Sequence, residues 1–277
     1  MISRSLCAPR LCVKKMFFCV FSGKNCGESL EAQPGSRSHY LKYKITSTAI
    51  AITALMLAGP LSSAAFAADN ALSAEEKAAG WQLLFNGLNM SQWRSFKQPE
   101  VHDKWQIENG AITLTAGGGG DLISKQRYKD FELTLDWKIA QAGNSGIFIL
   151  ADEQGQYIYS HAPEIQILDN QRHSDNKLDT HLSGSLYDMI ASPVASHKPA
   201  GQWNSTKIRL HKQTLTIWQN DLQSAKVTIG GAQWKDLVAN SKFANWPGFA
   251  KATAGHIGLQ DHGDRVWFKN IKIKELN

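Results

Sequence analysis

Cysteine is absent from the chain after residue 26, and the four that precede this point are Cys7, Cys12, Cys19 and Cys26. Their spacing contains no C-x-x-C pair, so the sequence gives little support for a metal site among them. The 210 residues beyond position 67 (277 − 67) have no disulfide to stabilise them and depend on an apolar core. This length is sufficient for one sizeable domain.

A membrane-spanning run of about 20 apolar residues is also lacking. The apolar run at 45–57 is shorter, follows two lysines and leads through small residues to Ala65-Phe66-Ala67. These features are typical of a secretory signal and predict cleavage after Ala67 or Ala68. Because no cysteine lies near this site, we expect no lipid anchor. We expect a periplasmic or secreted protein that has no membrane span after cleavage.

The segment at 1–40 is too long to be the basic n-region of such a signal. We therefore interpret it as an upstream extension of the reading frame, with synthesis beginning near Leu41 from an alternative start codon. N-terminal sequencing of the unprocessed precursor tests this interpretation, and a precursor that starts at Met1 would contradict it. The predicted organisation is a leader at 1–67, a helical lead-in at 68–79 and a jelly-roll domain at 80–277.

Without the leader, the sequence has no excess of positive or negative charge. The full sequence has a formal net charge of +6, but residues 1–67 carry 8 basic and 2 acidic side chains. The remainder has 30 − 8 = 22 basic and 24 − 2 = 22 acidic residues. The mature chain is therefore close to neutral, and its charge gives no indication of a nucleic-acid partner.

Helical periodicity is scarce as well. Residues 69–80 predict a short helix with Ser73 as its N-cap and Gly80 as its stop. Beyond it, short runs rich in β-branched and aromatic residues alternate with turn signals such as Gly230-Gly231. We expect strands at 105–107, 111–115, 131–139, 146–150, 164–168, 207–210, 214–218, 225–229, 256–259 and 266–273. Many short strands separated by turns favour an antiparallel sandwich or barrel.

Apolar and polar residues alternate strictly at 131–137, and the same pattern recurs at 207–210 and 271–274. This alternation predicts half-buried strands in two packed sheets. Between 160 and 205 the pattern loosens into long polar connections. Such loops on a rigid sheet are where functional sites usually lie.

The sequence lacks a Ser-His-Asp order, a P-loop and a dinucleotide-binding glycine pattern. Polar residues instead gather in four short segments. They are Asn144 in a G-N-S-G turn, then Glu164, Gln166 and Asp169 in a strand, then His181, Tyr187 and Asp188 in a loop, and finally Gln260 and His262 after a strand.

Each of these segments also has an ordinary structural interpretation. Alternation places Glu164 and Gln166 on one face of their strand, but that face could simply be solvent-exposed. Asp169 could cap the next turn, and Asn144 could belong to a plain hairpin turn. A histidine in a loop is often just solvated, and 260–263 could be a polar hairpin tip. The residues alone leave these alternatives open.

Six motifs in register give the chain a resemblance to a known family. They read GWQLLFNG at 80–87 with Trp93, NSGIF at 144–148, PEIQILD at 163–169, GSLYD at 184–188, GQWN at 201–204 and GLQDHG at 258–263. Together they closely resemble the 3-keto-disaccharide hydrolase family from about Gly80 to Leu276. One departure is Leu88-Asn89-Met90, where the family more often has a Lys-Asp-Leu type of turn. That departure concerns the first strand and not the site.

The resemblance implies an all-β, concanavalin-like jelly-roll sandwich of two antiparallel sheets, and an enzyme that cleaves 3-keto-glycosides. A ketone at C3 acidifies the proton on C2, so that a base can remove it and the glycosidic oxygen on C1 can leave by β-elimination. Addition of water to the resulting enone completes a net hydrolysis. The route requires a base, a donor to the enolate oxygen and an acid, but no matched pair of carboxylates.

Under the implied chemistry, we assign the base to Glu164 or His181, with a pKa moved toward neutrality by its neighbours. The proton donor is assigned to His262 or Tyr187. The resemblance fixes the class of reaction better than the ligand. The choice between the two candidate bases and the choice between the two candidate proton donors both stay open.

The remaining candidates are assigned to binding the substrate. Asn144 and Gln166 are expected to orient hydroxyls or polarise the ketone, and Gln260 to contact the sugar. Asp169 and Asp188 are expected to orient the other groups. No cofactor is required, although a divalent cation held by Glu164, Asp169 and His181 is a further alternative.

Two other functional classes remain as alternatives. A non-catalytic carbohydrate-binding module would use the same concave sheet face, and a fold alone does not distinguish a lectin from an enzyme. A laminarinase-type glycosidase carries an E-x-D-x-x-E strand, and here Gln166 replaces the middle acid, so this alternative is the weakest. Because a glycoside must first be oxidised at C3 to give a 3-keto-glycoside, we expect a separate sugar 3-oxidoreductase as a partner.

Overall fold

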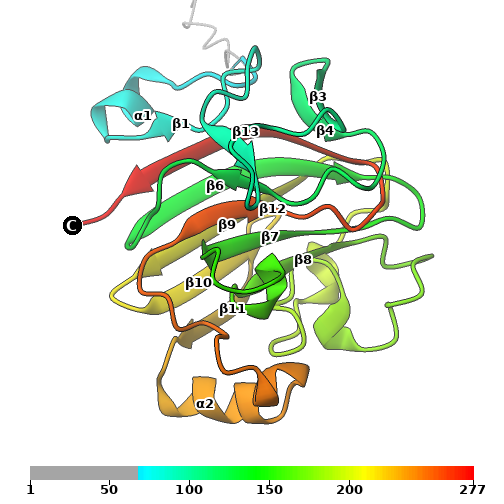
Figure 1. The fold of residues 1–277 in the computed structure, drawn as a ribbon, viewed down its shortest axis with the longest axis vertical. Coiled ribbons are helices and arrows are strands. Elements are labelled where there is room, and N and C mark those ends of the chain that lie inside the picture. The colour runs from blue at the N-terminus through cyan, green and yellow to red at the C-terminus, as the bar shows by residue number, and fades with distance from the viewer. Residues whose placement is uncertain (1–67) are drawn as a thin grey trace, which may run out of the picture. The chain divides into compact units, whose positions relative to one another are not determined.

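The computed structural model describes residues 68–277, so the predicted signal at 45–67, the start near Leu41 and the four cysteines lie outside the described residues. Within this range the chain forms two antiparallel sheets that pack face to face (Figure 1). The predicted all-β, concanavalin-like jelly-roll sandwich is confirmed.

The larger sheet, called sheet A, contains eight of the strands in residues 68–277, and all of its pairs are antiparallel. The strand β1 pairs beside the main path with β13. In spatial order the path is β11 (Leu222–Thr228), β10 (Thr214–Gln219), β9 (Asn204–His211), β6 (Phe131–Ile139), β13 (Val266–Glu275), β4 (Ala111–Leu114) and β3 (Trp105–Glu108), with β1 at Gln82–Leu83.

The smaller sheet, called sheet B, contains the other five strands of the described chain and is also antiparallel. In spatial order it is β2 (Trp93–Ser95), β5 (Leu122–Ser124), β12 (His256–Leu259), β7 (Asn144–Ala151) and β8 (Glu164–Leu168). Strands β7 and β8 therefore form one edge of sheet B, and this edge carries the polar motifs of the sequence.

The ten strands predicted from alternation and turn signals are all present, with bounds that differ by no more than three residues at either end. The strands that sequence patterning missed are β1, β2 and β5, which have two or three residues each. Such short strands show too few residues for a period of two to be visible, and their pairing partners lie far away in the chain.

The core lies between the two sheets. Sheet B contributes Ile147, Ile149, Ile165 and Ile167, which are at most 1% exposed, and sheet A contributes apolar residues such as Leu133. Full burial of one such side chain stabilises a protein by about 1.5–3 kcal/mol. A core of this size explains how residues 68–277, which contain no cysteine, can hold their fold.

Helices are short in this domain. The predicted N-terminal helix is confirmed as α1 (Ala74–Ala78), with Ser73 as N-cap and the Ser73 and Glu76 side chains bonding each other's backbone N–H groups. A second helix, α2 (Ala232–Ala239), follows β11 and was not predicted. It buries Trp234 and lies at the end of the sandwich (Figure 1).

A bulge in β13 is held by residues from the start of the described chain. The β13–β6 register shifts between Lys269 and Lys272, where Asn270 has a left-handed φ of 53°. Asn70 and Asn270 bond each other's backbone through their side chains, since the N–H of each donates to Oδ1 of the other at 2.6 and 2.8 Å. We call this pair of reciprocal bonds the asparagine clasp.

Loops cover the outer face of sheet B. The 3₁₀ turn η1 (Ile158–Ser160) packs Ile158 against Phe148 and Ile123 in a second, smaller apolar cluster on that face. As a result every residue of β7 and β8 is buried. No helix within residues 68–277 has the length and apolarity that crossing a membrane requires.

Candidate active site

The outer face of β8 carries the central acid of the site. Glu164 and Gln166 point away from the core, yet they are only 6% and 1% exposed because loops cover this face. Gly146, the β7 partner of Gln166, makes room for the acid, because a Cβ at this position would collide with Oε1 of Glu164. The interpretation of β8 as an ordinary solvent-facing strand is therefore wrong.

The charge of Glu164 is strongly perturbed by its surroundings. Burial raises the pKa of Glu164 to about 8, and the nearby carboxylates of Asp121 and Asp175 act in the same direction. The Lys242 ammonium and a hydrogen bond from the Gln260 amide partly oppose this rise. A carboxyl group that titrates near neutral pH in a buried site is suited to take up and release a proton during a reaction.

Lys242 belongs to the 3₁₀ turn η4 (Lys242–Asn245), which sequence reasoning did not associate with the site. The backbone N–H of Lys242 donates to Oδ2 of Asp188 at 2.7 Å, and Nζ lies 4.1 Å from the ring centre of Tyr187. Although much of the residue is exposed, burial of the ammonium lowers the pKa of Lys242, and the charge of Glu164 opposes that shift.

His181 is held between two carboxylates. Its Nδ1 lies 2.8 Å from Oδ1 of Asp175 and its Nε2 lies 2.9 Å from Oδ1 of Asp188. Because each ring nitrogen already faces a carboxylate oxygen at hydrogen-bonding distance, neither is free to contact a substrate proton. Of the two predicted bases, the geometry therefore favours Glu164, and His181 instead orients the two aspartates.

Tyr187 also belongs to this network. Its hydroxyl donates to Oδ2 of Asp175 at 2.9 Å, and its ring lies 4.5 Å from that of His181. Burial and the hydrogen bond to Asp175 raise the pKa of Tyr187. A tyrosine whose proton is held this firmly is a weak acid. Asp175, which links Tyr187 to His181, was not among the predicted residues.

Three buried side-chain amides in residues 68–277 have an oxygen that accepts no hydrogen bond. Among the described side chains, Oδ1 of Asn144 and Oε1 of Gln166 and Gln260 have no hydrogen-bond partner. The backbones of the three residues lie close to Gly146, because Gln166 pairs with Gly146, the Gln260 backbone N–H donates to the Gly146 carbonyl, and Asn144 is two residues away on β7. Unpaired buried acceptors are costly, and each of these oxygens needs a donor that the described side chains do not supply.

Asp169 has a structural role in this arrangement. It is 3% exposed, and its two carboxylate oxygens accept the backbone N–H groups of Ala142 and Gln171 at 2.8 and 3.1 Å. The alternative interpretation of Asp169 as a turn cap is thus the one that its hydrogen bonds favour. From the end of β8, Asp169 holds the turn that carries Asn144. Its carboxylate oxygens are bonded to the backbone and are not directed at a substrate.

His262 is exposed and follows Gln260 by two residues in the segment after β12. Its ring centre is 6.0 Å from that of His173, and the two histidines and Asp264 are the group of described residues whose metal-ligand atoms come within 4.8 Å of one another. Nδ1 of His173 accepts the backbone N–H of Asp175, so a cation at this nitrogen would require the hydrogen bond to break. The predicted set of Glu164, Asp169 and His181 does not converge in this way.

Aromatic side chains border the site on the side of η1 and η4. Tyr157 and Tyr159 stack at 5.1 Å, and the Tyr159 ring lies 5.9 Å from that of Trp246. The two tyrosines are 50% and 37% exposed. Partly exposed aromatic faces are suited to stack on flat or C–H-bearing ligand surfaces.

Comparison with known proteins identifies the family. A family profile described as the 3-keto-alpha-glucoside-1,2-lyase-like domain matches residues 80–274. The chain belongs to this family. The relation predicted from the six sequence motifs is confirmed. A curated 3-keto-disaccharide hydrolase of Bacteroides thetaiotaomicron is 40% identical over 231 residues, which cover 72% of this chain and 80% of that protein.

Solved structures of related proteins share the fold of this family member. A provisionally named glycosyl hydrolase of Parabacteroides distasonis is 32% identical, with a TM-score of 0.71 over 76% of this chain and 100% of that chain. A second protein of the same organism and description is 27% identical, with a TM-score of 0.56 over 71% of this chain and 99% of that chain.

The motifs that carry the family relation converge in space. Strand β7 holds the NSGIF motif, β8 holds PEIQILD, and these strands pair directly. The GSLYD motif bonds to β8, since the Gln166 N–H donates to the Ser185 carbonyl and the Tyr187 N–H to that of Glu164. GLQDHG ends β12 beside Gly146. Four of the six motifs thus meet around β7 and β8 of sheet B.

Proposed function

We propose that this chain cleaves 3-keto-glycosides by removing the C2 proton and expelling the aglycone from C1. That it is a hydrolase-type enzyme acting on glycosides follows from its family and from its 40% identity to the curated hydrolase. The proposal of C2 proton removal rests on one observation, which is that burial raises the pKa of the Glu164 carboxyl to about 8. Within residues 68–277, buried amide oxygens without hydrogen-bond partners lie on the same strands and beside them.

Glu164 is the base in this proposal. In its ionised form it takes the proton from C2, and the C–H electron pair moves to form a double bond between C2 and C3, which leaves an enolate on the C3 oxygen. The high pKa of Glu164 makes its carboxylate a stronger base than an ordinary glutamate. Gly146 permits the close approach of the carboxyl to the neighbouring strand.

Lys242 stabilises the enolate in this proposal. Its ammonium is held over the Tyr187 ring and interacts with Glu164 by charge. As the proton moves to Glu164, the carboxylate charge disappears and negative charge develops on the C3 oxygen. A cation positioned beforehand next to that oxygen favours the transition state over the ground state.

His262 donates the proton to the leaving oxygen in this proposal. The enolate electrons return to form the C1–C2 double bond, the C1–O bond breaks, and the aglycone leaves as an alcohol once protonated. Tyr187 is the weaker candidate because its hydroxyl is already bonded to Asp175 and its pKa is raised. Addition of water to the enone at C1 then gives the free 3-keto-sugar.

We also propose that the chain works outside the cytoplasm, in the periplasm or medium, and depends on a separate sugar 3-oxidoreductase for its substrate. The predicted signal at 45–67 supports export. Fractionation of cells that produce the full sequence tests this step, and an unprocessed chain found in the cytoplasm would contradict it.

The mature chain, residues 68–277, should be incubated with 4-nitrophenyl glucosides and with their 3-keto counterparts, in both anomeric forms. We expect 4-nitrophenolate release from a keto substrate only. Substitution of deuterium for the C2 proton should slow this release, because C–H cleavage is part of the proposed route. Release from both kinds of substrate at equal rates, with no effect of deuterium, would indicate an ordinary glycosidase instead.

The same assay separates the enzyme from the carbohydrate-binding alternative. Binding of the 3-keto-glucoside without release of nitrophenolate would contradict catalysis and favour a lectin-like module. Glu164→Gln supplies the matched control, since it keeps the size of the side chain and removes the base. The variant should bind the keto substrate and release no aglycone above background.

A further inference from the structure

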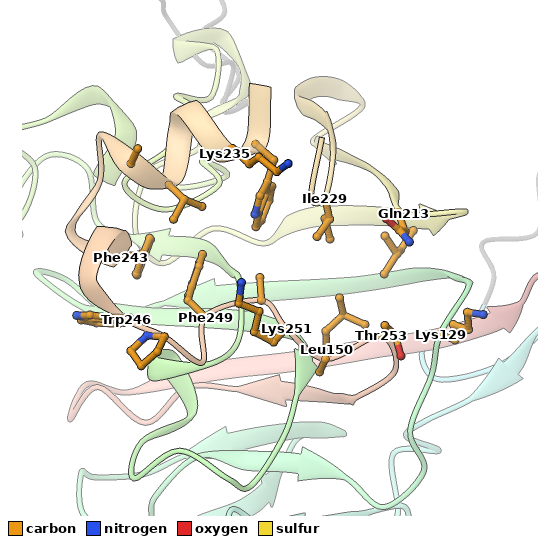
Figure 2. A pocket seen from close by; sticks show the side chains of 18 of the residues that line it. Lys129, Leu150, Gln213, Ile229, Lys235, Phe243, Trp246, Phe249, Lys251 and Thr253 are labelled. Carbon is orange, nitrogen blue, oxygen red and sulfur yellow. The ribbon is translucent and has the colours of Figure 1, made fainter. Parts of the chain in front are cut away.

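A large cavity lies apart from Glu164, at the end of the sandwich beneath α2. Its volume is about 910 Å³, and it runs between α2 and the segment at 246–253 (Figure 2). The buried part of its wall is apolar. It is formed by Leu150, Leu210, Ile229, Trp234, Phe243 and Phe249. We call this cavity the α2 groove.

The polar residues of the α2 groove are mainly cations. Lys129, Lys212, Lys235 and Lys251 all line it, and none of the four ammonium groups forms an ion pair with a carboxylate in residues 68–277. Asp130 is the acidic residue of the lining, and its Oδ1 already accepts the Lys212 N–H.

This concentration of charge is unusual for the chain. Beyond residue 67 the protein has 30 − 8 = 22 basic and 24 − 2 = 22 acidic side chains, and it pairs several surface charges with partners of opposite sign. Four such lysines around one apolar cavity create a local positive potential. This potential attracts an anion, and the low polarity of the buried wall strengthens the attraction.

The turn η4 separates the α2 groove from the candidate active site. Phe243 and Trp246 line the groove, whereas Lys242 lies against Tyr187, with its Nζ 5.9 Å from the Trp246 ring. None of Glu164, Gln166 and Gln260 lines the groove. The groove is therefore a distinct cavity that shares one wall element with the site.

We propose that the α2 groove is a second binding site for an organic anion with an apolar body, such as an alkyl or aryl carboxylate. The apolar wall provides no array of hydrogen bonds for a sugar, but it can bury a hydrocarbon chain or an aromatic ring. The lysines at the rim neutralise the acidic head group. This inference does not rest on the proposed reaction.

The α2 groove contains its own reporter, since Trp234 and Trp246 both line it. The mature chain should be titrated with 8-anilinonaphthalene-1-sulfonate, with probe fluorescence and tryptophan emission followed together. We expect saturable binding of one molecule per chain, weakened by added salt. Dodecanoate and 2-naphthoate then compete in separate arms, which distinguishes an alkyl from an aryl body.

Two variants test the location and the charge requirement. Lys235→Gln with Lys251→Gln should weaken binding of the sulfonate about fivefold, the size expected for two partly exposed charge pairs. The same pair of changes should leave binding of the neutral probe N-phenyl-1-naphthylamine unaltered. Lys226→Gln, an exposed change on β11 outside the groove, is the matched control and should have no effect.

A third variant, Ala239→Trp, places a large ring in the groove from an exposed position at the end of α2 and should abolish binding. The proposal is overturned if no probe binds at millimolar concentration. It is equally overturned if the folded lysine variant binds the sulfonate as tightly as the parent, or if Ala239→Trp binds normally.

Discussion

Strand β6 of sheet A differs from strands β7 and β8 of sheet B in the burial of its polar side chains. In β6, buried residues alternate regularly with half-exposed ones. In β7 and β8 every residue is buried. The difference arises because solvent reaches the outer face of β6, whereas loops and 3₁₀ turns cover the outer face of sheet B.

The same amino acid behaves differently on the two strands. Glu132 on β6 is half-exposed and pairs with Arg209 at 3.2 Å and Lys207 at 3.9 Å, contacts that contribute little stability at a surface. Glu164 on β8 is buried, and burial raises its pKa to about 8. A buried, perturbed carboxyl costs stability, which is why such groups are found where they perform chemistry.

Glu164→Gln and Glu132→Gln therefore form a matched pair of variants. The Glu164 change should lower kcat by about 10²- to 10⁴-fold, the range expected for loss of a general base. The Glu132 change should leave kcat within about twofold and change the free energy of unfolding by at most about 0.5 kcal/mol. Steady-state kinetics on a 3-keto-glucoside and urea denaturation measure both effects. Comparable kinetic losses from the two variants would remove the contrast.

Gly146→Ala tests the close packing behind Glu164. Its Cβ would collide with the Glu164 carboxyl, so the acid must move away from its position over β7. We expect kcat/KM to fall about tenfold or more, and the free energy of unfolding to fall by about 1–3 kcal/mol. If Gly146→Ala has full activity and reduced stability, the position of Glu164 over Gly146 does not matter for turnover.

Lys242→Met tests the charge coupling at the site. The Lys242 cation lowers the pKa of Glu164, so its removal should raise that pKa above about 8. Because the ionised base is the active form, the rise of kcat/KM with pH should move to higher pH. Activity at pH 7 should then fall more than activity at pH 9, and each rise of about 1 in the pKa should lower activity at pH 7 about tenfold. A uniform loss at every pH would contradict the coupling.

Gln166→Leu and Gln219→Leu compare two buried glutamines, one on each sheet. Both have an unpaired Oε1, but Nε2 of Gln219 bonds the Ser183 and Ser196 carbonyls within the loops beside sheet A. Gln166→Leu should raise KM about fivefold with little change in thermal stability. Gln219→Leu should lower stability by about 1–3 kcal/mol without changing KM. A KM effect from Gln219→Leu alone would reverse the assignment.

Much of the fold could be predicted from the sequence because its information is local. Alternation at 131–139 is visible over nine residues, and the observed β6 has the same bounds. The helix α2 was missed because it has only eight residues and its N-cap, Gly231, makes no side-chain bond. Turn signals at Gly230-Gly231 marked the end of β11 but gave no sign that a helix begins there.

The candidate site was only partly predictable, for a physical reason. Four of the candidate residues lie on neighbouring strands or directly after one, namely Glu164 and Gln166 on β8, Asn144 on β7 and Gln260 after β12. Alternation alone places Glu164 and Gln166 on one face. Lys242 reaches Glu164 from a turn 78 residues later (242 − 164), through tertiary packing that no local pattern encodes. Which oxygens of Asp169 are already bonded likewise depends on the folded loops.

The asparagine clasp has a consequence for where this protein can be cut. The family match begins at residue 80, but the reciprocal bonds between Asn70 and Asn270 fasten the bulge of β13 to residues upstream of that limit. Asn270 belongs to β13, the longest strand of the sandwich. A recombinant version that begins at residue 80 would lack Asn70 and so leave the Asn270 backbone N–H without its acceptor. Expression designs should therefore begin no later than Asp69, whose carboxylate also receives the Asn270 amide.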